Sequence, residues 1–139
     1  MEDNEKQILD VIKESNEIYR VKGSQSALDK LLYAWEELIT EPKTKNKMAT
    51  VLVSFIAKYY FDMNLFDKAL YWGEILKESQ KYKIDSGEGY FLCGKIYFEM
   101  GQKSNAFEEF KIAWEKSDGR IFKDKPKIYL DFYRNSKKV

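Results

Sequence analysis

Small residues recur at fixed positions in the stretch that begins at Gly89, GYFLCGKIYFEMGQKSNAFEEFKIAW. Gly94 precedes a turn glycine, Gly101, and Ala106 and Ala113 follow that turn at helical spacing. Two helices joined by a short turn approach closely only where small side chains face each other, and larger side chains fill the space around that contact. The stretch therefore predicts a helical hairpin with its closest approach at Gly94 and Ala106.

The rest of the chain repeats this arrangement of helix, short turn and helix. Only two prolines and seven glycines occur in 139 residues, and almost no alternation of β-branched and polar residues indicates a strand. Hairpins of this size cannot bury both faces alone, so they stack. We therefore predict one all-α domain over residues 1–139, with three stacked antiparallel hairpins at about 4–40, 45–80 and 86–117 and a capping helix at about 125–135.

The spacing resembles the tetratricopeptide repeat, a helical hairpin of about 34 residues with small and aromatic residues at set positions. The unit laid from Gly87 onward matches at Tyr90, Gly94, Tyr97, Ala106, Phe110 and Ala113. A weaker copy keeps Ala57, Tyr60 and Ala69, and the weakest keeps Ala27 and Ala34. The resemblance implies a solenoid of stacked hairpins. An unrelated bundle of antiparallel helices is the alternative.

The residue types argue against catalysis by this chain. Histidine, the commonest general base and metal ligand, is absent, and no glycine-rich phosphate loop occurs. The one cysteine, Cys93, lies in an apolar helical run and is expected to be a core thiol. We therefore expect no enzyme activity, no metal and no cofactor, and a single cysteine favours a reducing, cytoplasmic location.

Charge and hydropathy also narrow the class of partner. The net charge is +1, and the lysines at 43, 45 and 47 and at 123, 125 and 127 form only small clusters with acids nearby. We therefore expect no nucleic-acid partner. The longest apolar run is short and contains Lys58, so we expect no membrane partner. The remaining class is a protein-binding module, whose oligomeric state the sequence leaves open.

The family resemblance implies where such a partner would bind. In tetratricopeptide proteins the first helix of each hairpin lines a concave groove. Carried over by position, the groove residues are Asn16, Tyr19 and Arg20 in the first hairpin, Ser54, Lys58, Phe61 and Asp62 in the second, and Phe91, Lys95, Phe98 and Glu99 in the third. Burial between hairpins is the alternative for Phe61, Phe91 and Phe98.

The tail GRIFKDKPKIYLDFYR suggests a more specific function. It is similar to the ends of small repeat proteins that are encoded beside bacterial polymorphic toxins, through Gly119, Arg120, Phe122, Pro126, Lys127 and Tyr129. The resemblance implies an immunity protein that binds and neutralises the carboxy-terminal domain of a cognate toxin. The alternative is a scaffold or adaptor that organises other proteins or binds a regulatory peptide.

Overall fold

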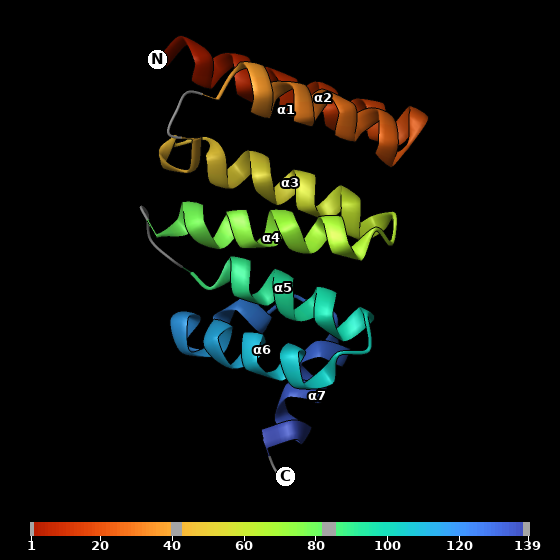
Figure 1. Cartoon of the computed structure of the whole chain (residues 1–139), viewed down its shortest axis with the longest axis vertical. Helices are drawn as coiled ribbons and strands as arrows, with labels where there is room; N and C mark the ends of the chain where they lie inside the picture. The colour runs from red at the N-terminus through yellow and green to blue at the C-terminus, as the bar shows by residue number, and fades with distance from the viewer. Residues whose placement is uncertain (1, 40–42, 82–85, 138–139) are drawn as a thin grey trace. The chain divides into compact units, whose positions relative to one another are not determined.

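The protein is all-helical, as the sequence predicts. The computed structural model describes residues 2–39, 43–81 and 86–137. These residues form seven α-helices and two short 3-10 helices, and no strand occurs among them (Figure 1). The chain divides into two compact units, unit 1 at residues 1–82 and unit 2 at residues 83–139. Each unit is described separately below.

Unit 1 consists of two packed helix pairs. Its elements are α1 (Glu2–Lys22), α2 (Ser24–Glu37), the 3-10 helix η1 (Lys43–Lys45), α3 (Ala49–Asp62) and α4 (Phe66–Gln80). Helix α1 packs against α2, α3 packs against α4, and α2 joins the two pairs by packing on α3. The buried Ser15 hydroxyl donates a hydrogen bond of 3.0 Å to the carbonyl of Ala27, which ties α1 to α2.

The core of unit 1 is mostly aliphatic. Its large, fully buried aliphatic side chains come from all four of its α-helices: Ile8, Leu28, Leu31, Leu52, Ile56 and Leu76. The core also contains an aromatic pair: Trp35 of α2 packs edge to face on Trp72 of α4, with ring centroids 5.4 Å apart. Aliphatic side chains that recur every third or fourth residue give each helix one buried stripe, so the two pairs bury a shared core.

Unit 2 contains one helix pair and a third helix that closes its core. Its elements are α5 (Glu88–Glu99), α6 (Lys103–Ser117), the 3-10 helix η2 (Arg120–Phe122) and α7 (Lys127–Lys137). Helices α5 and α6 approach closely at Gly94, as predicted. The side chain that fills the contact is Phe110, because a Cβ at Gly94 would lie 2.5 Å from its ring. Ala106 is fully buried.

The core of unit 2 is aromatic. Phe110 is fully buried and contacts the rings of Phe91, Phe122, Tyr129 and Phe132, with centroids 5.5 to 6.1 Å apart. Two of these rings belong to α7, so the last helix completes the core. Edge-to-face and offset ring pairs of this kind stabilise a core beyond the area that they bury.

Element ends differ from the predictions by a few residues. Helix α1 is two residues longer at each end than the expected span of 4–20, and α7 begins after Pro126 and not at Lys125. The predicted end of the first hairpin near residue 40 lies outside the described residues, and α2 ends at Glu37. The sequence did not predict the 3-10 helices η1 and η2.

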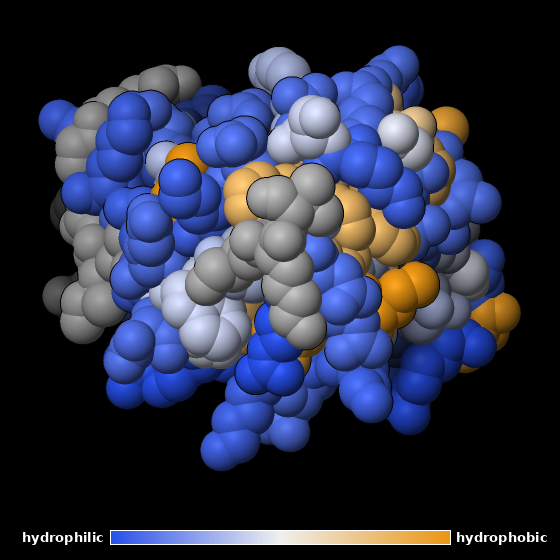
Figure 2. Space-filling view, turned by 90° about the horizontal axis from the view of Figure 1, so that it is seen from below, coloured by the Kyte–Doolittle hydropathy of each residue, from blue (hydrophilic) through white to orange (hydrophobic). Residues whose placement is uncertain are grey.

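The described helices are all too short or too polar to cross a bilayer. Viewed from the side of Figure 1 on which α7 lies, the surface is largely hydrophilic, with hydrophobic atoms gathered in a few patches (Figure 2).

Candidate partner-binding surface

Side chains of α1 and α3 in unit 1 meet in a cluster at the carboxyl ends of both helices. Tyr59 donates its hydroxyl to the Asn16 Oδ1 at 2.9 Å, and its ring lies 5.2 Å from the ring of Tyr19. The ammonium of Lys58 lies 5.5 Å from the Tyr19 ring centroid and 5.3 Å from that of Tyr59. Three of the predicted groove residues, Asn16, Tyr19 and Lys58, are therefore neighbours.

Ion pairs border this cluster. Lys58 pairs with Asp62 at 3.0 Å, and Arg20 pairs with Glu17 at 2.6 Å. The hydrogen bond from Arg20, followed by its charge, lowers the pKa of the Glu17 carboxyl. Both predicted cations are thus neutralised within the chain. A partner would meet an aromatic surface with a balanced charged border, which is the usual composition of a protein interface.

The same face continues toward the amino ends of α1 and α3. Leu9 and Val51, 42% and 40% exposed, are unusually accessible aliphatic residues, and Tyr19 is 39% exposed. A depression of about 380 Å³ lies beside Leu9, and Glu5 and Lys47 on its border form an ion pair of 2.8 Å. We call this face the α1/α3 surface; it comprises Glu5, Leu9, Asn16, Tyr19, Arg20, Lys47, Val51, Lys58 and Asp62.

Two predicted groove residues of unit 1 point elsewhere. Ser54 donates its hydroxyl back to the Thr50 carbonyl of its own helix, at 2.7 Å. Phe61 is partly buried and its ring lies 5.6 Å from that of Phe66, across the turn between α3 and α4. These two side chains contribute to the helix and the turn that hold the α1/α3 surface in place.

The four predicted groove residues of unit 2 lie beside α7. Phe91 is only 3% exposed and packs on Phe122 and Tyr129, so its ring belongs to the core and does not face a partner. Phe98 is covered by Tyr129 and Phe132, with ring centroids 5.6 and 5.2 Å away. Both rings pack on η2 or α7, which belong to no hairpin, so the contacts differ from the alternative of burial between hairpins.

Glu99 and Lys95, the polar residues among these four, contact rings of the unit 2 core. Glu99 accepts a hydrogen bond of 3.3 Å from the Tyr129 hydroxyl, and the Lys95 ammonium lies 5.8 Å from the Phe91 ring centroid. Burial first, and then the charge of Glu99 and this hydrogen bond, raise the pKa of Tyr129 to about 12. Glu99 therefore contacts α7 through Tyr129, whereas Lys95 lies beside a ring of its own helix.

One residue of the α1/α3 cluster was not predicted from the sequence. Tyr59 contacts Tyr19, Asn16 and Lys58 and is itself almost fully buried. The sequence places two tyrosines side by side at positions 59 and 60, next to Lys58. Helical periodicity alone does not tell which of two adjacent tyrosines reaches a helix 43 residues earlier.

The described residues hold no group of three or more cysteine, aspartate or glutamate side chains arranged to bind a metal ion. The buried thiol of Cys93 lies in α5. Comparison with known proteins adds no family: the sequence matches no protein-family model, and no curated protein is significantly similar to it. The geometry of the α1/α3 surface is therefore the main guide to function.

Proposed function

We propose that this chain is a protein-binding module that contacts its partner through the α1/α3 surface. The observation that carries the proposal is Tyr19, an exposed aromatic ring that packs on Tyr59 with the Lys58 ammonium near both rings. Exposed tyrosines held in place by their neighbours are typical interface anchors, because they bring a large contact area and lose little freedom on binding. No catalysis by the chain is required.

We further propose that the helix pairs are repeats of the tetratricopeptide type. Support comes from Ala57, Ala69, Ala106 and Ala113, which are fully buried small residues at the positions where that repeat has them. Contacts of α1 with α3 and with the turn before it add to this, because Glu5 meets Lys47, and both Asn16 and Tyr19 meet Tyr59, at offsets of 40 to 43 residues. A repeat of this kind presents its first helices on one face, and α1 and α3 are the first helices of their pairs.

For the partner, we propose the carboxy-terminal domain of a cognate bacterial toxin, which the chain would bind and neutralise. The support is the similarity of the tail to immunity proteins. Phe122 and Tyr129 of that tail are buried in the core of unit 2, and a Cβ at Gly119 would lie 2.8 Å from Trp114. The tail residues thus have structural roles, and we assign the toxin contact to the α1/α3 surface.

A co-expression experiment tests the proposed function. The carboxy-terminal domain encoded by the neighbouring gene is expressed in bacteria with and without this chain, and growth and co-purification are measured. We expect rescue and a stable complex. Tyr19→Ala should weaken that complex by about 2 kcal/mol, roughly thirtyfold, as loss of an interface anchor does.

Tyr33→Ala is the matched control, since Tyr33 is another exposed tyrosine of unit 1 and lies on α2, outside the α1/α3 surface. Equal weakening by both changes would contradict the assignment of the surface. Toxicity without rescue or binding would contradict the toxin partner and favour a scaffold or adaptor.

A further inference from the structure

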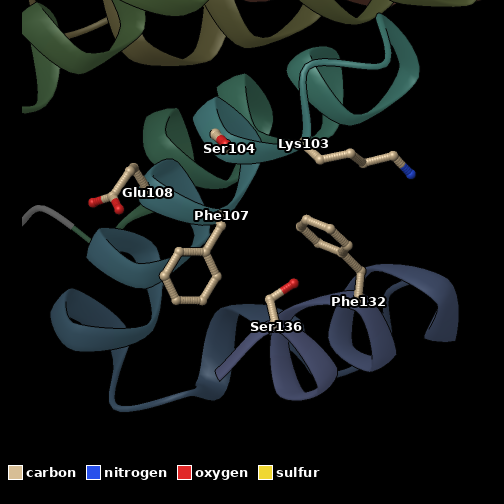
Figure 3. A pocket seen from close by; sticks show the side chains of 6 residues that line it. All are labelled: Lys103, Ser104, Phe107, Glu108, Phe132 and Ser136. Atoms are coloured by element: carbon tan, nitrogen blue, oxygen red, sulfur yellow. The ribbon is translucent and has the colours of Figure 1, made fainter. Parts of the chain in front are cut away.

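Unit 2 has a groove that the α1/α3 surface does not include. Helix α7 crosses α6 and diverges from it, and the two helices leave an open groove of about 330 Å³ between them (Figure 3). Four lining residues come from the first part of α6 and two from the second half of α7: Lys103, Ser104, Phe107, Glu108, Phe132 and Ser136. We call it the α6/α7 groove.

The floor of the groove is aromatic and its two ends carry opposite charges. The Phe107 and Phe132 rings point into the space between the helices (Figure 3). At one end, the Lys103 ammonium lies 3.9 Å from the Phe98 ring centroid and 5.4 Å from that of Phe132. Glu108 lies at the other end. Neither Lys103 nor Glu108 forms an ion pair with any described residue.

The wall of the groove repeats with the period of a helix. Lys103 and Phe107 stand four residues apart on α6, and so do Ser104 and Glu108, so each pair lies on one line along the helix. The side chains of a second helix can pack between those of this wall, because the residues of both helices recur with the same pitch of about 5.4 Å. Helix α5 packs along α6 in this way on the other side, and no described helix does so at the groove.

From this geometry we propose that the α6/α7 groove binds an amphipathic helix of a partner protein. An aliphatic side chain of that helix enters between Phe107 and Phe132. An acidic residue one turn away pairs with Lys103, and a basic residue one turn away on the other side pairs with Glu108. The opposite charges at the two ends fix the direction in which the helix lies.

A defined peptide tests this proposal on the full chain. The probe is a fluorescein-labelled, alanine-based helix of about 16 residues, with one leucine, a glutamate one turn before it and a lysine one turn after it. Fluorescence anisotropy should show saturable binding. Lys103→Glu and Glu108→Lys should each weaken binding about fivefold, because a favourable ion pair becomes a repulsive one.

Matched controls lie on the same helix. Lys111→Glu and Glu115→Lys make the same charge changes at exposed positions of α6 that do not line the groove, and should leave binding unchanged. Tyr19→Ala should also leave it unchanged, which separates the groove from the α1/α3 surface. Absence of binding would overturn the proposal, as would equal loss in the control variants or equal binding of a peptide with the leucine replaced by serine.

Discussion

Units 1 and 2 contain the same number of aromatic residues but use them differently. Each has eleven, although unit 1 spans 82 residues and unit 2 only 57. In unit 2 they pack on one another around Phe110, and α7 contributes three of the rings in that cluster. In unit 1 the core is largely aliphatic, and Tyr19, Tyr33 and Tyr71 are exposed.

This difference shows what the high aromatic content means. An excess of aromatic residues suggests an adhesive surface, but in unit 2 most of them are the core of a small unit that has few other large side chains to bury. In unit 1 three tyrosines are exposed, whereas in the described part of unit 2 only partly buried rings such as Phe107 and Phe132 reach the surface. The units also differ in charge, because unit 1 has 12 basic and 14 acidic side chains and unit 2 has 12 and 9. Because exposed aromatic rings are typical interface anchors, we assign the proposed toxin contact to unit 1.

The largest expected effect on stability comes from truncating a buried side chain in the core of one unit at a time. Phe110→Ala should destabilise unit 2 by about 3–5 kcal/mol, because it removes a fully buried ring that four others contact. Leu28→Ala should destabilise unit 1 by about 2–5 kcal/mol. Native-state hydrogen exchange should show that each change exposes amides mainly in its own unit. Equal loss of protection in both units after either change would show that they unfold together.

Alkaline pH should weaken unit 2 more than unit 1. The pKa of Tyr129 is raised to about 12 from an ordinary value near 10, so the folded state favours its neutral form. This contribution is complete below pH 10 and is lost as the pH rises from 10 through 12, by up to about 3 kcal/mol. Urea unfolding of the wild type and of Tyr129→Phe between pH 9 and 12 measures it. Identical pH profiles for the two proteins would contradict the prediction.

A change at the closest helix contact should have a smaller effect. Gly94→Ala places a methyl group against the rigid, enclosed Phe110 ring and should cost on the order of 2 kcal/mol through overpacking. Thermal unfolding monitored by circular dichroism provides the measurement. A stabilised variant would mean that the Phe110 ring shifts at no cost in stability. The tight contact between Gly94 and Phe110 would then not limit the packing of unit 2.

The smallest expected effect is at the α1/α3 surface. Lys58→Met removes an exposed ion pair with Asp62 and should change the free energy of unfolding by less than about 1 kcal/mol. Denaturant unfolding tests this. A large loss of stability would mean that the Lys58 cluster holds unit 1 together, and its proposed role in binding would lose its support.

The sequence predicts the helices well because each has a local signal. Turn glycines such as Gly23 and Gly101 have positive φ values of 91° and 79°, which only glycine adopts readily, and they separate the helices where expected. The start of α5 is less predictable. Serine often caps a helix, so Ser86 would be expected there, but the residue directly before the helix is Gly87, in the left-handed region with a φ of 85°.

The candidate site was harder to predict, since it depends on which helix covers which. The family spacing names Asn16, Tyr19 and Lys58, which lie around Tyr59 in the structure, but it also names Phe91 and Phe98. Helical periodicity marks these two rings as one face of α5. It carries no information on whether that face meets solvent, a partner or α7, because the contact with Tyr129 spans 31 to 38 residues.

The edge-to-face contact of Trp35 with Trp72 has a practical consequence. Two indoles held 5.4 Å apart couple their electronic transitions and give a characteristic near-ultraviolet dichroism, whereas the third tryptophan, Trp114, belongs to unit 2 and lies among phenylalanine and tyrosine rings. The coupled pair therefore reports optically on unit 1, and Trp114 fluorescence in a Trp35→Phe, Trp72→Phe background reports on unit 2. The chain thus carries an intrinsic spectroscopic label for each of its halves.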